Sequence, residues 1–257
     1  MSAVPYSRYI FGSLPWYSVL IVLAMLIGLL LCTHEQKRLQ LPKDLFVDLA
    51  LCLIPSAIVG ARLYYVVFSW EQFSGDILRI FRIWEGGLAI YGGILGGTIA
   101  LIAFCRVRKL SILQLADILV PALSLGQAIG RWGNYFNMEA YGAEVTNAAW
   151  QFFPAAVLVS GADGYEWHMA TFFYESCADL LIFIVLWFVI RKRKQWNGQS
   201  LAVYMLMYGI ARAWIEGLRT DSLYIGAIRV SQLLSLVIAF IGLLTLLIRF
   251  FRHRQKG

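Results

Sequence analysis

Seven long apolar segments constrain this chain more than any other feature of its 257-residue sequence. Each is near the roughly 20 residues that an α-helix needs to cross about 30 Å of hydrocarbon. The chain is 60% hydrophobic and only 14% charged, which excludes an ordinary soluble domain. We therefore predict an all-α polytopic membrane helix bundle of about seven transmembrane helices, in a single domain of residues 1–257. The predicted spans are residues 16–33, 46–68, 86–104, 112–130, 171–190, 200–217 and 230–249.

Basic residues are concentrated in four short segments between or after these spans. These segments are residues 34–43, 105–111, 191–199 and the tail from residue 249. They hold 14 of the 22 Lys and Arg residues, and such an excess marks cytoplasmic loops. Seven spans then place the N-terminus outside and the C-terminus in the cytoplasm. The net charge of +7 is explained by this topology, so we expect the lipid bilayer and no nucleic acid as a partner.

The predicted outer connections are residues 69–85, 131–170 and 218–229. We expect the longest of them, at about 131–170, to form a small extracytoplasmic cap. Its aromatic residues favour headgroup depth, where Trp and Tyr are enriched. Simple anchoring at the interface and a role in function both remain open for this cap.

A polar segment follows the fourth apolar run and reads GQAIGRWGNYFNMEAYG over residues 126–142. One explanation is an interfacial loop with a snorkelling arginine. However, an ionisable side chain in hydrocarbon costs about 2.5 to 3.5 kcal/mol and by default indicates a functional site. Arg131, Asn134, Asn137 and Glu139 can satisfy one another and still present donors to an anion. We therefore interpret this segment as an anion-binding site.

Two further arginines lie within predicted spans. Arg212 and Glu216 are spaced for an i, i+4 pair, which either locks the bundle or, with an unmatched Arg219, receives an anion. Arg62 lies in GARLYY in the outer half of the second span and there requires a carboxylate or a phosphate. Arginines thus outnumber nearby carboxylates. This excess suits a phospholipid headgroup that enters from the outer leaflet, because guanidinium groups bind phosphate bidentately.

The third span begins EGGLAIYGGILGG. The spacings Gly92/Gly96 and Gly93/Gly97 predict close helix packing. Tyr91 lies between these glycines and is expected to project its hydroxyl into the interior.

No metal site is predicted, since the four cysteines lack a C-x-x-C spacing and the three histidines are far apart.

The polar segment resembles the signature G-R-x-G-N-[FY]-x-N-x-E-x-x-G of the prolipoprotein diacylglyceryl transferases, integral membrane enzymes of bacteria. The resemblance extends over most of the chain, in WYS at 16–18, GARLYYVVF at 60–68, WEGGLAIYGGILGG at 84–97, HMATFFYES at 168–176 and YGIARAWIEGLR at 208–219. It implies transfer of an sn-1,2-diacylglyceryl group from phosphatidylglycerol to the lipobox cysteine of a prolipoprotein signal peptide, the first step of lipoprotein maturation. No metal or organic cofactor is implied.

The resemblance also implies roles for individual residues. Tyr17 matches a family tyrosine, although residence in the interfacial aromatic belt is the alternative. Many members carry histidine at the position of Tyr91, and a tyrosine with a pKa of about 10 is a poor base at neutral pH. The predicted catalytic residues are Arg131, Glu139, Arg212 and Tyr91. The predicted phosphatidylglycerol-binding residues are Arg131, Asn134, Arg212, Glu216, Arg62, Tyr17 and Gly142.

Within this reaction, we expect Arg131 and Arg212 to hold the phosphate, and Glu139 to orient an arginine or accept the thiol proton.

Two other classes of protein are alternatives to a transferase. A transporter or lipid flippase would also use intramembrane arginines, but it predicts inverted repeats, and none is evident. A structural scaffold leaves the arginine excess unexplained.

Overall fold

The computed structural model describes residues 7–160, 164–220, 224–225 and 228–254. The chain divides into two compact units, one made of residues 1–30 and 116–257, the other of residues 31–115. Helix α1 (Trp16–Arg38) crosses the first boundary and α4 (Ile112–Asn137) crosses the second. Part of α1 and part of α4 therefore belong to each of the two units.

The smaller unit is built on two helices, α2 (Leu45–Phe68) and α3 (Ile90–Arg108), which pack against each other. Their backbones meet at glycines. A Cβ added to Gly92 would lie 2.3 Å from the carbonyl oxygen of Gly60, and one on Gly96 would lie 2.3 Å from that of Ser56. The predicted close packing is confirmed for Gly92 and Gly96, because only a residue without a side chain fits there.

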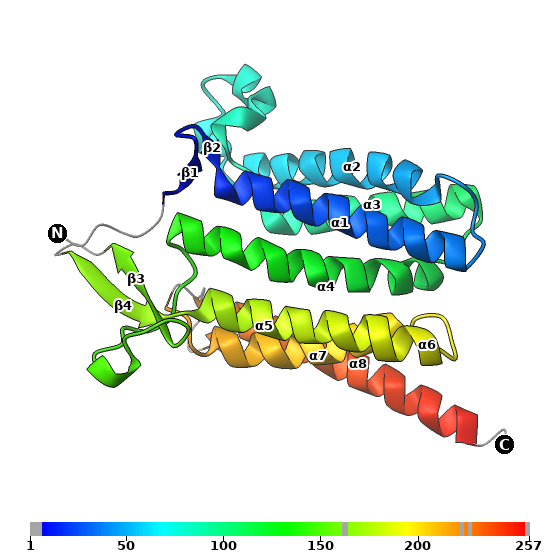
Figure 1. Cartoon of the computed structure of the whole chain (residues 1–257). Coiled ribbons are helices and arrows are strands. Elements are labelled where there is room, and N and C mark those ends of the chain that lie inside the picture. The colour runs from blue at the N-terminus through cyan, green and yellow to red at the C-terminus, as the bar shows by residue number, and fades with distance from the viewer. Residues whose placement is uncertain (1–6, 161–163, 221–223, 226–227, 255–257) are drawn as a thin grey trace. The chain divides into compact units, whose positions relative to one another are not determined.

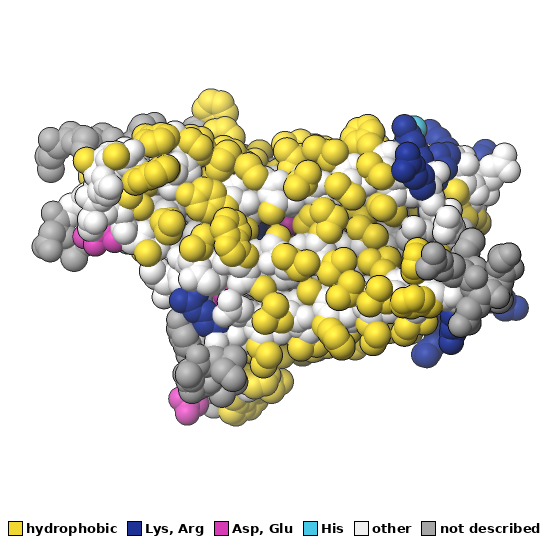
Figure 2. Space-filling model, turned by 90° about the horizontal axis from the view of Figure 1, so that it is seen from below, with side chains coloured by type: hydrophobic (Ala, Val, Ile, Leu, Met, Phe, Trp, Pro, Cys, Tyr) yellow, Lys and Arg dark blue, Asp and Glu magenta, His cyan; other side chains and the backbone are white. Residues whose placement is uncertain are grey.

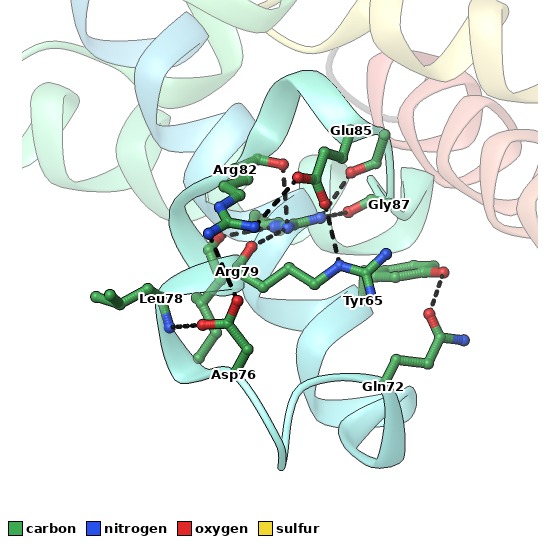
Figure 3. Close-up of polar contacts among 11 residues, drawn as sticks. Tyr65, Gln72, Asp76, Leu78, Arg79, Arg82, Glu85 and Gly87 are labelled. Atoms are coloured by element: carbon green, nitrogen blue, oxygen red, sulfur yellow. Dashed lines mark hydrogen bonds and ion pairs between the residues drawn. The ribbon is translucent and has the colours of Figure 1, made fainter.

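Three short 3-10 helices connect α2 to α3, namely η1 (Trp70–Gln72), η2 (Ile77–Phe81) and η3 (Ile83–Glu85). Asp76 caps η2 by accepting a hydrogen bond of 3.1 Å from the backbone N–H of Leu78 (Figure 3). The connection ends at Gly86 and Gly87, whose φ angles are +88° and +76°. Helix α3 therefore begins at Ile90 and not at the predicted residue 86, since two positive φ angles interrupt a helix.

The larger unit contains α4, α5 (Thr171–Ile184), α7 (Gln199–Glu216) and α8 (Val230–Arg254), which run side by side (Figure 1). Helix α5 continues through the π-helical stretch η5 (Val185–Ile190) into α6 (Arg191–Arg193). The hydroxyls of Ser124 and Ser176 donate hydrogen bonds of 2.7 and 2.8 Å to backbone carbonyls across the contact between α4 and α5. The start of α7 is held by a side chain from α4.

That side chain is Asp117, which is buried. Its carboxylate accepts hydrogen bonds from the backbone N–H groups of Gly198 at 2.6 Å and Leu201 at 3.0 Å. It also forms an ion pair of 2.8 Å with Lys194. A carboxylate at the first turn satisfies otherwise unpaired N–H groups and complements the helix dipole, so α4 fixes where α7 begins.

Six helices in the described part of the chain are long and apolar enough to cross a membrane. They cover Trp16–Arg38, Leu45–Phe68, Ile90–Arg108, Ile112–Asn137, Thr171–Arg193 and Val230–Arg252. Hydrophobic side chains dominate the helical face seen in Figure 2, as lipid contact requires. The prediction of an all-α polytopic membrane protein is confirmed. The seventh predicted span corresponds to the 18-residue α7, which carries Arg212 and Glu216 and is not among these six helices.

One predicted helix end next to the cap is wrong. Helix α4 ends at Asn137 and not near residue 130, so the first part of the polar segment is helical. The rest of the predicted cap includes residues 161–163, which lie outside the described residues. It holds η4 (Ala148–Trp150) and an antiparallel hairpin of β3 (Ala156–Ser160) and β4 (Tyr165–Met169), whose buried side packs on Trp132 and Phe172.

Two smaller strand pairs lie near other helix ends of the larger unit. One pairs β1 (Tyr9–Ile10) with β2 (Leu14–Pro15) immediately before α1. The other pairs β5 (Tyr224–Ile225) with β6 (Ile228–Arg229) immediately before α8. Residues 221–223 and 226–227 of the third predicted outer connection lie outside the described residues.

Candidate active site

A buried ionic cluster lies within the larger unit, where α4, α5 and α7 run side by side (Figure 1). Each helix contributes charged residues to a contact among helices that are otherwise apolar. The cluster consists of Arg131 from α4, Glu175 and Asp179 from α5, and Arg212 and Glu216 from α7. The three carboxylates are 2 to 4% exposed, so their charges depend on these arginines and not on water.

Glu175 is at the centre of this ionic cluster. Its Oε2 lies 2.7 Å from Nε of Arg131, and its Oε1 accepts a hydrogen bond from Nη1 of Arg212. Asp179 follows one turn later on α5, with Oδ2 4.0 Å from Nε of Arg131. On the other side of Arg212, the predicted i, i+4 pair is confirmed by a distance of 2.7 Å from Nη2 to Oε2 of Glu216.

Arg131 differs from Arg212 in how many of its N–H donors are free of contacts with carboxylates. Its Nε is the nitrogen closest to the carboxylates, in an ion pair without hydrogen-bond geometry, and its Nη1 and Nη2 atoms make no hydrogen bond within the described residues. Its side chain is 21% exposed. Arg212 is instead engaged by carboxylates on two sides. Arg131 therefore has the free donors that a phosphate requires.

Two more arginines border the ionic cluster. Nη1 of Arg219 lies 3.6 Å from Oε1 of Glu175, so the prediction that Arg219 is unmatched is wrong. Arg229 donates a hydrogen bond from Nη1 to the backbone carbonyl of Glu216. Among the described residues, the guanidinium groups of Arg131, Arg212 and Arg219 lie against the three carboxylates of the cluster. The sequence analysis did not count Glu175 and Asp179, which lie on another helix and balance this positive charge.

Glu139 lies apart from this cluster. It is exposed, and its Oε1 accepts a hydrogen bond of 3.1 Å from Nδ2 of Asn137, whose Oδ1 in turn accepts one of 3.1 Å from Nε of Arg8. The expectation that Arg131 and Glu139 satisfy each other is wrong. Arg131 lies on α4, whereas Glu139 follows the helix end between Met138 and Ala140, both with positive φ.

The other predicted residues of the larger unit lie close to the end of α4. The ring of Tyr17 covers Gly133, where an added Cβ would lie 2.4 Å from the ring carbon Cδ2. The side chain of Asn134 makes no hydrogen bond within the described residues, so its amide is available to a ligand. The structure thus brings the WYS motif and the polar segment together.

Gly142 is buried where three segments meet. Its N–H donates a hydrogen bond of 3.0 Å to the carbonyl of Met169, and its own carbonyl is 2.9 Å from Nδ1 of His168. An added Cβ would lie 2.8 Å from the carbonyl oxygen of Leu218 and 2.9 Å from Cγ2 of Thr171. Glycine is needed here because the cap, α5 and the end of α7 approach too closely for a side chain.

Arg62 belongs to the smaller unit and is 5% exposed. Its guanidinium group donates five hydrogen bonds to backbone carbonyls of the connection between α2 and α3. The acceptors are Ile80 at 2.8 Å, Gly86 at 2.6 Å, Gly87 at 3.0 Å, Arg79 at 2.6 Å and Arg82 at 3.3 Å. The expectation that Arg62 requires a carboxylate or a phosphate is therefore wrong, since carbonyl oxygens occupy all five of its N–H donors.

The same connection neutralises its own charges. Nε of Arg79 lies 3.0 Å from Oε2 of Glu85, and Arg82 lies 3.5 Å from both Asp76 and Glu85 (Figure 3). Figure 3 also shows Tyr65, whose hydroxyl donates a hydrogen bond of 3.3 Å to Gln72. Arg62 and these pairs together explain how a segment of short helices keeps a defined structure.

Tyr91 is the second residue of α3 and is 40% exposed. Its ring lies 6.4 Å from that of Tyr64, and its hydroxyl makes no hydrogen bond within the described residues. It belongs to the smaller unit. Its predicted catalytic role stays a prediction.

Sequence reasoning missed the two carboxylates of α5. Glu175 lies in the motif HMATFFYES, and Asp179 follows it at i+4 in an apolar run. That spacing places both on one face of a helix, and two acidic groups in a span require basic partners. The sequence therefore contained the signal for these two carboxylates.

For metal binding, the described residues contain no group of three or more His, Cys, Asp or Glu side chains suited to an ion.

These features define a polytopic helical membrane protein with an ionic site buried between its helices. Comparison with known proteins gives the particular family. The family model described as prolipoprotein diacylglyceryl transferase matches residues 7–248, and the chain belongs to this family of transferases. It is a multi-pass bacterial membrane protein.

Curated relatives of the chain carry the name phosphatidylglycerol–prolipoprotein diacylglyceryl transferase. One from Finegoldia magna is 45% identical over 91% of this chain and 91% of its own length. One from Synechocystis is 44% identical over 90% of this chain and 83% of its own length. One from Listeria monocytogenes is 41% identical over 90% of this chain and 84% of its own length. The similarity to these relatives covers nearly the whole chain, and the family model spans every segment of the ionic cluster.

Proposed function

We propose that this chain transfers the sn-1,2-diacylglyceryl group of phosphatidylglycerol to the thiol of the lipobox cysteine in bacterial prolipoproteins. Family membership gives the reaction class and the two kinds of substrate. The structural observation that best supports the proposal is the open Nη edge of Arg131, next to a buried cluster of further arginines and carboxylates. Such an edge matches two oxygens of a phosphodiester.

In the proposed reaction, the substrate thiolate attacks C3 of the diacylglyceryl unit. A carbon–sulfur bond forms, the bond from C3 to the bridging phosphate oxygen breaks, and that oxygen leaves with glycerol phosphate. The thiol proton passes to a base, for which Glu139 is our candidate because its exposed carboxylate is accessible. The attacking sulfur belongs to the prolipoprotein, so no cysteine of this chain is required.

Arg131 would bind the phosphate in this reaction and stabilise the negative charge that grows on the leaving group. Arg212 would contribute its positive charge from beside Arg131, held by Glu175 and Glu216. Asn134 would donate a hydrogen bond to the headgroup. Tyr17 and Gly142 would shape the surrounding site through their close contacts with α4 and the cap.

The proposed topology places this chemistry near the outer leaflet. Helix α1 ends in Lys37 and Arg38, α3 ends in Arg106 and Arg108, and α6 is wholly basic. Facing these ends to the cytoplasm puts the opposite ends of α4, α5 and α7, which carry the ionic cluster, on the outer side. The N-terminus is then outside, the C-terminus is in the cytoplasm, and residues 138–170 form an extracytoplasmic cap.

The test is a transfer assay with the purified chain in vesicles. A lipobox peptide should gain the mass of one diacylglyceryl group in phosphatidylglycerol vesicles and remain unchanged in phosphatidylethanolamine vesicles. A peptide with Ser in place of the lipobox Cys is the matched control. Movement of lipid across the bilayer without any thioether product would contradict the proposal and favour the flippase alternative.

A further inference from the structure

Glu175 links arginines from different helices through one carboxylate. Oε2 lies 2.7 Å from Nε of Arg131 on α4, and Oε1 accepts a hydrogen bond from Nη1 of Arg212 on α7. Nη1 of Arg219, just beyond α7, lies 3.6 Å from the same Oε1. The Glu175 side chain is 4% exposed, so it has little contact with water or lipid. Its two oxygens set the separation between the guanidinium groups of Arg131 and Arg212.

The contact with Glu175 also decides which edge of Arg131 is open. A guanidinium group is planar, so a carboxylate on its Nε edge leaves the end-on pair of N–H groups, one on Nη1 and one on Nη2, directed away from that carboxylate. A free arginine side chain samples many rotamers, of which phosphate binding selects one. Fixing Nε in advance reduces the reorganisation needed when a phosphate binds or becomes more negative.

We propose that Glu175 is the positioning residue of the anion site, holding Arg131 and Arg212 so that the Nη edge of Arg131 meets the lipid phosphate. The inference rests on the proposed function and deepens it. Glu175 itself is too buried, and too fully engaged by arginines, to contact the reacting thiol. It acts through Arg131, so its loss misplaces charge at the leaving group.

Positioning makes a different kinetic prediction from a purely structural role. Misplaced donors weaken an interaction that strengthens in the transition state, so kcat falls while KM for phosphatidylglycerol changes little. A structural role lowers the amount of folded protein and its melting temperature without changing kcat per folded molecule. The two roles are therefore separable in one set of variants.

The informative variants are Glu175→Gln and Glu175→Asp. Gln keeps the shape but replaces one oxygen with an amide donor, which cannot accept from an arginine. Asp keeps the charge but is one methylene shorter, so it reaches only one of the two arginines well. The matched control is Asp117→Asn, which removes another buried carboxylate of the same unit. Asp117 lies 14 residues before Arg131 on α4, about 21 Å along the helix.

The experiment measures kcat and KM for diacylglyceryl transfer in phosphatidylglycerol vesicles, normalised to folded protein, together with melting temperatures. We expect kcat to fall about a hundredfold in Glu175→Gln, the size typical of a lost oxyanion contact. In Glu175→Asp it should fall about tenfold, with KM within threefold of the unmodified chain in both. Asp117→Asn should lower the melting temperature and leave kcat within threefold.

Several outcomes would overturn the inference. These are an unchanged kcat in either Glu175 variant, equal loss in Glu175→Asp and Glu175→Gln, or a loss in Asp117→Asn as large as in Glu175→Gln. If Glu175→Gln does not accumulate in membranes, Glu175→Asp decides alone through its kcat. If the unmodified chain transfers no diacylglyceryl group, both the proposed function and the inference are contradicted. If the unmodified chain and the Glu175 variants are all fully active, only the inference is contradicted.

Discussion

Arg62 and Arg131 both have guanidinium groups largely inside the protein, and they use them differently. Arg62 gives all five N–H donors to backbone carbonyls of its own unit. Arg131 gives only its Nε edge to carboxylates. The first arrangement fixes a loop, and the second leaves donors for a ligand. At the scale of single residues, the open donors and not burial alone identify the anion-binding arginine.

Replacing Arg131 with Lys tests this distinction. Lysine keeps the positive charge near Glu175 but has no planar pair of Nη donors for a phosphate. We expect the transfer rate in phosphatidylglycerol vesicles to fall about a hundredfold, with normal insertion into the membrane. Arg108→Lys is the control, because Arg108 forms a half-exposed pair with Asp48 in the other unit. Near-normal turnover in Arg131→Lys would show that bidentate binding is not the contribution of this residue.

Tyr91 is tested by Phe and by His. If its hydroxyl donates one hydrogen bond to the substrate, that bond contributes about 0.5 to 1.5 kcal/mol. Tyr91→Phe should then reduce turnover roughly three- to tenfold, and Tyr91→His should not increase it at neutral pH. The measurement is the transfer rate at matched membrane levels. An inactive Tyr91→Phe protein, or a faster Tyr91→His protein, would instead make this position part of the proton-transfer chemistry.

At the scale of elements, the sequence predicts helix contacts that depend on the spacing of glycines within one helix. It does not predict contacts that depend on residues far away in the sequence. The G-x-x-x-G spacing predicted that α3 packs closely on another helix, which is α2 in the structure, and apolar runs predicted most helix ends. The end of α4 was missed because GRWGNYFN is polar but still helical: Arg131 pairs with Glu175 of α5, and Tyr17 of α1 covers Gly133. The five carbonyls around Arg62 come from irregular backbone, which no periodicity indicates.

Two neighbouring glycines of α3 provide a matched test of the contact with α2. A Cβ on Gly92 would lie 2.3 Å from the carbonyl oxygen of Gly60, whereas one on Gly93 would lie 3.5 Å from that of Ala57. Gly92→Ala should lower stability by about 1 to 3 kcal/mol through overpacking. Gly93→Ala should be neutral or stabilising by up to about 1 kcal/mol, since Ala favours a helix.

The measurement is thermal unfolding of the two purified variants under identical detergent conditions. We expect a lower melting temperature for Gly92→Ala only. Equal melting temperatures for both variants would mean that the backbones of α2 and α3 are not in direct contact at Gly92.

At the scale of the whole molecule, the central structural prediction is orientation. A cysteine introduced at the exposed Ser160, in the cap, should react with a membrane-impermeant maleimide on intact cells. A cysteine at the exposed Gln195, in a basic connection, should react only after the cells are opened. The unmodified chain is the control, since its four cysteines lie within helices. The reverse pattern would invert the proposed topology.

Alkyl transfer from phosphatidylglycerol to a cysteine thiol predicts which bond of the lipid breaks. The test uses phosphatidylglycerol carrying a heavy oxygen isotope between C3 of the diacylglyceryl unit and phosphorus. Mass spectrometry then follows the lipobox peptide and the released headgroup. We expect a thioether-linked diacylglyceryl peptide without the isotope, and glycerol phosphate that retains the isotope fully. A peptide that carries the isotope, or that gains no diacylglyceryl group, would contradict the claim.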